Sequence, residues 1–471
     1  MTAAPLHVAV VAGYMPFFDE IMPPGYPRDR DDYGRAAAAA VGAVGRVSYL
    51  GLMADKAGGR AAGDRIAALA PDAVLLVPTM ATPATYLWSA VAPNPGVPVV
   101  VWAAHETGTV SADYDMVDLC RHSQNVGALM VGNMLSRHGR PFSVVAGERD
   151  DPAVRAEVVG TVGAAAVAGR LKTARIGRLG GPLDGYANVD VDPEALRAAI
   201  GIEIVDVSLE EWSGALAAVG ADDIERVLAA VRRHARLDDR GRPASVAAAA
   251  RMAAALEATA DRHGLAAGAI NCRGAFGVEG AEHPSLACLA VTHLTSRGVP
   301  FACTGDLVTA IAMAIGRALG GAAFYCELDA IDTGRDAFLL SNTGEGDYGW
   351  AGEPPDCHVF ATGADSGRRA EGCSVCQTLR PGPATMVGFS PRAGARGGFT
   401  LIAMEGETLE RPDVALSVTS AWFRSDRRPM RQAFAAWAEA GATHHGCLSP
   451  GRLGDRLALV ARHLGIDFAR I

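Results

Sequence analysis

The chain has 471 residues, of which 49% are hydrophobic and 20% charged, so its composition is that of a globular protein and excludes a disordered one. Its net charge of −9 argues against a nucleic-acid partner and supplies no basic face for an anionic membrane. At roughly 100–200 residues per domain, this length predicts about three domains. The apolar runs are shorter than the ~20 residues of a membrane span, and the first residues lack the pattern of a signal peptide. We therefore expect a cytoplasmic protein whose nine cysteines are reduced thiols.

The first third of the chain alternates short β-branched runs with Ala-rich helical patterns. Strands are expected at 7–11, 47–50, 73–77, 97–102 and 142–146. This alternation predicts a parallel sheet covered by helices on both faces. Ligands of such sheets bind beyond the carboxyl ends of the strands, where Tyr14 and Met15 follow the first strand.

The pattern restarts near Thr173 and changes character near Glu345, where Gly and Pro become frequent and strands dominate. We therefore predict an α/β protein with two Rossmann-like, doubly wound parallel-sheet domains, followed by a C-terminal antiparallel β domain with closing helices. The predicted boundaries are 1–170, 171–345 and 346–471.

Acidic residues follow two of the strands expected in the central domain. Asp306 comes after the 301–303 strand, and Glu327 and Asp329 lie at the end of a 322–328 strand that we also expect to be parallel. Carboxylates at such ends can point into a ligand crevice. Glu345 and Asp347 lie in a turn-rich segment that is either a simple loop or a further source of carboxylates. The alternative is that all of these carboxylates lie in solvated loops and have no role in ligand binding.

Histidines and cysteines supply other candidates. His444 and His445 are adjacent, and in an extended segment neighbouring side chains alternate in direction, so we expect at most one to enter a pocket. His105 and His122 are further, isolated candidates. The set Cys357, His358, Cys373 and Cys376 offers the donor types of a structural zinc site, with free thiols as the alternative.

Several segments resemble the L-arabinose isomerase and L-fucose isomerase superfamily. They are 174–180, 298–306 with the helix that follows, 322–327, 397–407 and 442–446. This resemblance implies an aldose–ketose isomerase that uses a divalent cation, usually Mn²⁺. Such a cation grips two adjacent sugar oxygens and polarises the carbonyl, while flanking carboxylates move protons through an enediol. It also implies a homo-oligomer, a trimer or hexamer, with active sites between subunits.

The resemblance assigns roles to individual residues. Glu327 falls on a carboxylate ligand that also serves as base, and His445 falls on the C-terminal ligand histidine. The two other ligand positions fall on Thr304 and Asn342, which carry no charge, so Asp306, Asp329, Glu345 or Asp347 would have to compensate. The catalytic set is then Glu327, Asp306 and His445. The expected substrate-binding residues are Tyr14, Met15, His105, Gln124, Thr304 and Asn342.

Three functions follow from this pattern. The first is a sugar isomerase that acts on a monosaccharide or modified sugar through an enediol with an altered metal site. The second is a different reaction on a modified sugar, such as an epimerase, lyase or biosynthetic step. The third is a sugar-binding homologue without turnover, which the neutral Thr304 and Asn342 favour.

Overall fold

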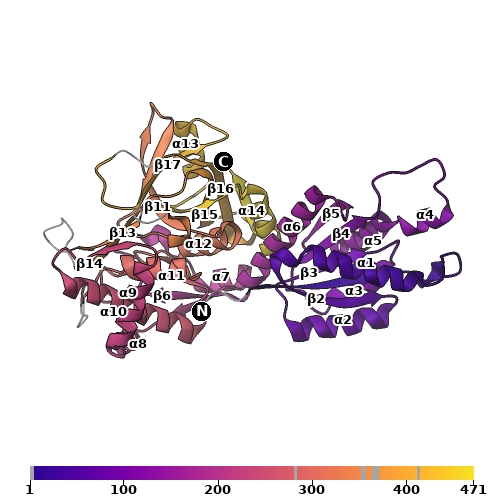
Figure 1. Ribbon diagram of the computed structural model, residues 1–471, viewed down its shortest axis with the longest axis horizontal. Helices are drawn as coiled ribbons and strands as arrows, with labels where there is room; N and C mark the ends of the chain where they lie inside the picture. The colour runs from indigo at the N-terminus through magenta and orange to yellow at the C-terminus, as the bar shows by residue number, and fades with distance from the viewer. Residues whose placement is uncertain (1–4, 280–283, 352–356, 363–370, 411–413) are drawn as a thin grey trace. The chain divides into compact units, whose positions relative to one another are not determined.

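The computed structural model describes residues 5–279, 284–351, 357–362, 371–410 and 414–471, and these form two compact units (Figure 1). The first unit contains Pro5–Lys172 together with Ala458–Gly465. The second unit contains Thr173–Leu457 together with Ile466–Ile471. The division into three domains stays a prediction.

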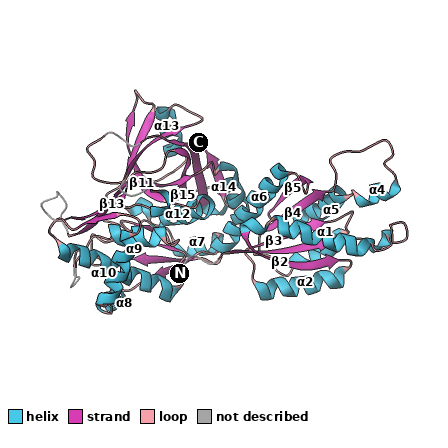
Figure 2. Ribbon diagram, viewed as in Figure 1, coloured by secondary structure: helices cyan, strands magenta, loops and turns pink. Residues whose placement is uncertain are grey.

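The first unit is built on a five-stranded parallel sheet in the order β2-β1-β3-β4-β5, which confirms the predicted α/β architecture. The strands are β1 (Leu6–Gly13), β2 (Gly45–Met53), β3 (Ala73–Pro78), β4 (Val99–His105) and β5 (Phe142–Glu148). The helices are α1 (Tyr26–Ala40), α2 (Lys56–Leu69), α3 (Ala84–Val91), α4 (Met116–Arg121), α5 (Gln124–Arg137) and α6 (Pro152–Leu171). Figure 2 shows these helices around the strands.

Alternate residues of each central strand enter two separate cores in this unit. Val8 and Val10 of β1 pack with side chains of α1 and α6, whereas Ala9 and Val11 pack with those of α2, α3 and α5. All six residues of β3 are buried. A strand covered on both faces reads as an unbroken apolar run, which is why these strands were predictable.

The second unit begins with a four-stranded parallel sheet in the order β10-β9-β6-β7. Its strands are β6 (Arg175–Leu179), β7 (Glu203–Asp206), β9 (Ala267–Ile270) and β10 (Phe301–Ala302). Its helices are α7 (Pro193–Ala199), α8 (Leu209–Ala217), α9 (Ala221–Arg232), α10 (Pro243–His263), α11 (Cys288–Ser296) and α12 (Leu307–Gly320).

A seven-stranded sheet, mostly antiparallel, forms the other half of this unit. Its strands are β11 (Phe324–Asp332), β12 (Ala337–Ser341), β15 (Gly382–Pro391), β16 (Phe399–Thr408), β17 (Ser420–Ser425), β18 (His445–Pro450) and β19 (Asp467–Arg470). The prediction that the 322–328 segment is a parallel strand is wrong, because β11 pairs antiparallel with β12 and β18. The residue types of an apolar strand do not indicate whether its neighbours run parallel or antiparallel to it.

This sheet closes on itself because β15 pairs with both β18 and β16. Phe324 and Cys326 of β11 point into its apolar core, together with Leu448 of β18 and Trp437 of helix α13 (Met430–Glu439). The residues between them on β11 and β18 therefore face outward. Closure leaves the strands in the ring without unpaired edges.

Helix α12 lies directly against the outer face of β18. A Cβ at Gly316 would come within 2.4 Å of the Ser449 Oγ and 3.0 Å of the Cys447 Sγ, so the helix approaches this closely because position 316 has no side chain. The contact fixes the start of α12, and with it Asp306, relative to the barrel.

A third sheet, in the order β14-β13-β8, carries the four residues for which a zinc site and free thiols were the two alternatives. Its strands are β8 (Arg236–Asp238), β13 (Cys357–Thr362) and β14 (Gly372–Gln377). Cys376 lies opposite His358, while Cys373 lies opposite Ala361, four residues or about 13 Å along β13 from Cys357. The four possible donors are therefore spread along the two strands. Among the described residues, they do not form a group that could hold a metal ion.

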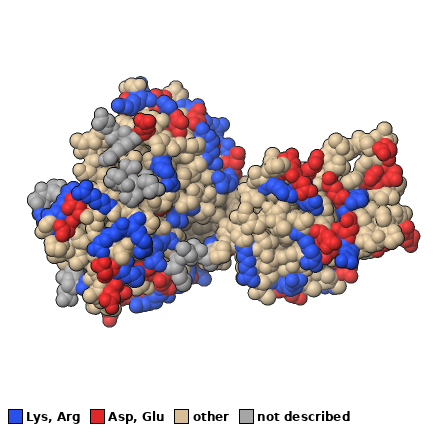
Figure 3. Space-filling model, viewed as in Figure 1, with Lys and Arg blue, Asp and Glu red and all other residues tan. Residues whose placement is uncertain are grey.

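The distribution of surface charges and the state of the cysteines can be compared with what the composition predicts. On the face shown in Figure 3, basic and acidic side chains are interspersed on both units. All nine cysteines are free, as predicted. Among the described residues, no helix is both long and apolar enough to cross a membrane.

The closing helix α14 (Gly454–Leu464) places a buried histidine in the first unit. His463 is 1% exposed, and its Nε2 lies 3.0 Å from the Ser143 Oγ. Burial, with Lys172 and Arg462 nearby, lowers the pKa of His463 to about 3. The folded protein therefore holds this imidazole neutral.

We predict that His463 makes the protein sensitive to acid. Because its folded pKa lies below the ordinary 6.5, the unfolded chain binds the proton first as the pH falls. The contribution of neutral His463 to stability is complete above about pH 6.5 and falls by up to about 2 kcal/mol by about pH 5. Urea unfolding at both pH values should show a smaller loss for His463→Gln than for wild type. Equal losses would refute this, and the exposed His138→Gln is the control.

Candidate functional site

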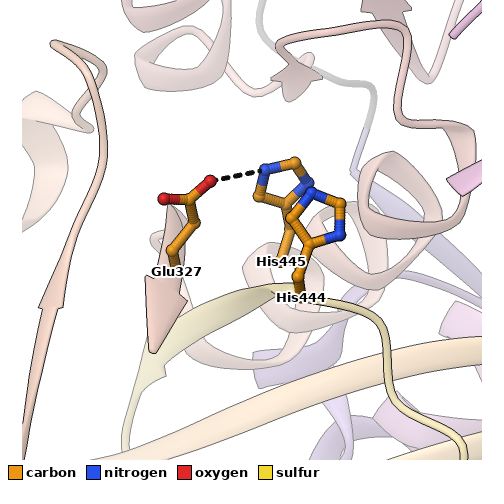
Figure 4. Close-up of side chains that lie close together, drawn as sticks. All are labelled: Glu327, His444 and His445. Carbon is orange, nitrogen blue, oxygen red and sulfur yellow. Dashed lines mark hydrogen bonds and ion pairs between the residues drawn. The ribbon is translucent and has the colours of Figure 1, made fainter. Parts of the chain in front are cut away.

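The site is built on a cross-strand pair. In the antiparallel register of β11 and β18, Glu327 lies directly opposite His445. Both side chains point outward from the barrel, because Cys326 and Leu448 point into its core. The Glu327 Oε1 lies 3.1 Å from the His445 Nε2, as the dashed line in Figure 4 shows.

Asp306 fixes the other side of the His445 ring. Its Oδ1 accepts a hydrogen bond from the Thr309 backbone N–H at 2.8 Å and so caps the N-terminus of α12. Its Oδ2 lies 2.8 Å from the His445 Nδ1, and the Tyr325 hydroxyl is 2.7 Å from the same nitrogen. Asp306 is fully buried, so it orients the imidazole and does not reach a substrate.

The turn before Asp306 is conformationally unusual. Thr304 has a φ of +54°, which is rare for a β-branched residue, and Gly305 follows at +75°. The Thr304 Oγ1 lies 3.4 Å from the Tyr325 hydroxyl. Such strained turns concentrate at functional sites, where the surrounding structure holds them.

Both histidines offer a ring nitrogen near Glu327, but only His445 is buried, whereas His444 is exposed. The rings of His444 and His445 lie 3.8 Å apart, and Figure 4 shows them on the same side as the Glu327 carboxylate. His444 precedes β18, and its ring is held by Asn188, whose Nδ2 lies 3.1 Å from the Nδ1, and by an edge contact with Tyr186. Strand alternation therefore does not govern His444.

The electrostatics follow from these contacts. The hydrogen bond from His445, against the effect of burial, lowers the pKa of Glu327, which keeps it ionised at neutral pH. Burial alone would lower the pKa of His445, but hydrogen bonds to Asp306 and Glu327 prevail and raise it to about 9. Burial and the neighbouring His445 lower the pKa of His444, which leaves it as a neutral donor.

Glu327, His444 and His445 form a group that could hold a metal ion. One potential ligand atom of each lies within 4.8 Å of those of the others. Two imidazoles and one carboxylate are a common donor set for divalent transition metals. Asp306 supplies the carboxylate that usually supports a ligating histidine from behind. The residues present therefore fit a divalent cation.

The carboxylates expected to compensate for Thr304 and Asn342 have separate positions. Asp329 is exposed at the bulge of β11. Its pKa is raised, first by partial burial of the carboxylate and then by the negative charge of the nearby Glu327. Asp347 is buried and accepts hydrogen bonds from the Ala323 and Gly349 N–H groups, so its role is structural. Glu345 is also buried. In place of a second carboxylate, the structure brings His444.

The substrate-binding residues expected near the N-terminus belong to the first unit. Gln124 is fully buried, and its amide nitrogen donates to the carbonyls of Thr79 and Arg121. Tyr14 is 2% exposed and donates to Asp19. The His105 Nε2 lies 2.9 Å from the Asn125 Oδ1, and Met15 is half-buried. Their roles in binding stay predictions.

Four residues of the site were missed by the sequence reasoning. They are Tyr325, Tyr186, Asn188 and Arg273. Tyr325 could have been found, because it is the outward neighbour of Glu327 two positions away on the same strand. Asn188 and Tyr186 follow a Gly-rich turn far from the histidines in sequence and give no signal. Arg273 lies after β9, and its charge helps to lower the pKa of Glu327.

Comparison with known proteins adds independent evidence. A family model described as the L-arabinose isomerase C-terminal domain matches residues 328–467. The sulfoquinovose isomerase of Priestia megaterium is 24% identical over 340 residues, which cover 68% of this chain and 69% of that protein. The sulfoquinovose isomerase of Alkalicoccus urumqiensis is 25% identical over 327 residues, which cover 67% and 68%.

We predict that Glu327, and not Asp329, binds the cation. Loss of a ligand charge in Glu327→Gln should weaken Mn²⁺ binding by more than about tenfold, whereas Asp329→Asn, on the same strand, should leave it unchanged. Titration of metal-free protein followed by electron paramagnetic resonance measures both affinities. The reverse order of effects would assign the carboxylate ligand to Asp329.

Proposed function

We propose that this chain is a divergent member of the arabinose and fucose isomerase-like proteins and an isomerase of a modified sugar. The observation that carries the proposal is the line Asp306–His445–Glu327, joined by hydrogen bonds of 2.8 and 3.1 Å. It leaves an ionised carboxylate at the end of a rigid chain of buried groups. Isomerisation of an aldose needs such a base to take a proton from the carbon beside the carbonyl.

Glu327 is suited to that role by exposure and by charge. Its side chain is 40% exposed, while that of His445 is only 2% exposed. The carboxylate is therefore the accessible member of the line. It would take the proton from one carbon and return it to the next, which converts aldose to ketose through an enediol. Asp306 and Tyr325 hold His445, so they position the base from behind.

We propose Mn²⁺ as the cation, held by Glu327, His444 and His445. The His445 Nε2 would lose its proton to bind the cation, which would then take the place of the 3.1 Å hydrogen bond between His445 and Glu327. When bound, the cation would polarise the sugar carbonyl and acidify the neighbouring hydroxyl. In this arrangement, the uncharged Thr304 and Asn342 are not ligands of the cation. Both are nearly buried, at 8% and 6% exposure, and remain proposed substrate contacts.

We propose sulfoquinovose, a hexose that carries a sulfonate group, as the substrate. The relatives that match more than two thirds of this chain are sulfoquinovose isomerases. Arg273 supports the assignment, because it is exposed and close enough to Glu327 to affect its pKa. A guanidinium binds a sulfonate through paired, charge-assisted hydrogen bonds.

The proposal predicts exchange of a substrate proton in D₂O. With Mn²⁺, the protein should interconvert sulfoquinovose and its ketose with deuterium entering at C1 or C2, as seen by NMR. Glu327→Gln should lose at least about a hundredfold in rate, since general acid–base groups contribute that much or more, while Asp329→Asn should keep the rate. Arg273→Gln should raise KM for sulfoquinovose and leave glucose unaffected. Binding without exchange, with or without metal, would instead indicate a sugar-binding homologue.

We also propose that the protein forms a homo-oligomer, a trimer or hexamer, through the first unit. Nine of the thirteen exposed large hydrophobic side chains among the described residues lie on that unit. Phe17 is 77% exposed, Met116 64% and Leu129 75%. Phe18 and Val117 of α4 pack against the same buried cluster, which brings part of this set together. A second copy of the chain is the partner that would cover them.

Multi-angle light scattering tests the assembly. The wild type should elute as an oligomer, and Phe17→Asp combined with Leu129→Asp should shift it to monomer, because a buried unpaired charge is costly. Leu209→Asp, at an exposed apolar position of the second unit, is the matched control. A monomeric wild type would refute the assignment.

A cytoplasmic location is proposed as well, because nine free cysteines suit a reducing compartment. Cell fractionation that recovers the protein outside the cytoplasm would refute it.

A further inference from the structure

The second histidine of the candidate site is contacted by a side chain that follows the parallel sheet of the second unit. Asn188 lies in the segment between β6 and α7, and its amide Nδ2 is 3.1 Å from the His444 Nδ1. His444 immediately precedes β18 and belongs to the group that could hold a metal ion. The contact therefore joins the candidate site to a segment 256 residues away in the sequence.

Backbone hydrogen bonds hold this segment beside the site. The Leu183 N–H donates to the carbonyl of Thr304, the residue with a positive φ, at 3.2 Å. The Tyr186 N–H donates to the Leu183 carbonyl at 2.8 Å. The Tyr186 ring lies edge-on against His444, with the ring centroids 4.9 Å apart. These contacts place the exposed side chain of Asn188 next to the imidazole.

The two histidines are held in the same way. The His445 Nδ1 lies 2.8 Å from the Asp306 Oδ2, and its Nε2 lies toward Glu327. The His444 Nδ1 meets Asn188, and Figure 4 shows that one nitrogen of this ring lies on the side away from Glu327. A histidine that binds a metal through one nitrogen usually donates the N–H of the other nitrogen to a neighbouring oxygen. Nε2 is therefore the nitrogen of His444 that can bind the cation.

The amide of Asn188 has two groups that can meet the His444 Nδ1. A neutral imidazole carries one proton, on either nitrogen. When the amide Nδ2 donates to Nδ1, the proton of the imidazole is on Nε2, which then cannot bind a cation. Half a turn of the exposed amide brings Oδ1 to the same place, where it accepts a hydrogen bond from the Nδ1–H and leaves the Nε2 lone pair for the cation. Only this second arrangement is compatible with cation binding.

We propose, on the basis of the cation site proposed above, that Asn188 is a positioning residue for His444. When the cation is bound, the Asn188 Oδ1 accepts the Nδ1–H and so makes Nε2 the ligand atom. Loss of such a partner typically weakens metal binding by about ten- to a hundredfold. Asn188 therefore sets the affinity for the cation without touching either the cation or the sugar.

Titration of the metal-free full chain with Mn²⁺, followed by electron paramagnetic resonance, tests this role. Asn188→Leu should weaken Mn²⁺ binding by about tenfold or more, because the Nδ1–H loses its acceptor. Asn188→Asp has the same shape and only accepts hydrogen bonds, so it should bind Mn²⁺ at least as tightly as the wild type. Ala187→Leu and Ala187→Asp, at the neighbouring exposed position, are matched controls for the bulk and the charge of these substitutions.

Nuclear magnetic resonance of the Cd²⁺-loaded protein identifies the ligand atom. With isotopically labelled cadmium and histidine, coupling to the metal should appear at the His444 Nε2, while Nδ1 keeps its proton. The signals are assigned by their loss in His444→Gln. Unaltered thermal unfolding of each metal-free variant shows that the fold is kept.

Four results would overturn the proposal. They are wild-type affinity in Asn188→Leu, equal losses in Asn188→Leu and Ala187→Leu, equal losses in Asn188→Leu and Asn188→Asp, and coupling of cadmium to the His444 Nδ1. A wild type that binds neither ion contradicts the cation site and this role together. Binding that depends on Asn188, without exchange of a sugar proton in D₂O, contradicts the isomerase activity alone and supports the role of Asn188.

Discussion

The pairing of β11 with β18 is the constraint on which the site depends. A shift of one residue in this antiparallel register would turn Glu327 or His445 into the barrel core. The alternation that sends Phe324, Cys326 and Leu448 inward therefore also fixes which carboxylate meets which imidazole. Asp306 completes the line only because α12 approaches β18 closely at Gly316. Apolar packing thus positions a polar network whose inner members, Asp306 and His445, are buried.

The candidate site departs from the family pattern in the chemistry of its donors. The resemblance implies carboxylate-rich ligation, and the sequence reasoning sought a substitute carboxylate for Thr304. The structure instead offers a second imidazole, from His444. His444 supplies a neutral nitrogen donor where a second carboxylate oxygen was expected, so the three side chains still offer three donors to a divalent cation such as the proposed Mn²⁺. Thr304 has a positive φ although its side chain offers no charged ligand at this position.

The strands of both parallel sheets were predictable because they are buried on two faces and read as short β-branched runs. The direction of neighbouring strands was not predictable, because the residue types of Phe324–Asp332 suit both parallel and antiparallel neighbours. Glu327 and His445 were identified through resemblance, whereas His444 was set aside by a rule that holds only within a strand. The cysteines of β13 and β14 satisfied a spacing rule, but the register separated them. The contacts of Asn188 and Tyr186 depend on tertiary approach across more than two hundred residues, which local patterns do not encode.

The first unit combines two segments that are far apart in the sequence, which affects when it can complete its folding during synthesis. This unit includes Ala458–Gly465, and the imidazole of His463 meets Ser143 only after the chain has been synthesised through residue 463. During synthesis, the N-terminal segment must therefore wait for the last helix before its packing is complete, although N-terminal domains generally fold first. A fragment that ends at Lys172 would lack this helix and its contact with Ser143 of β5. Cutting the gene between the two units therefore does not separate two independent proteins.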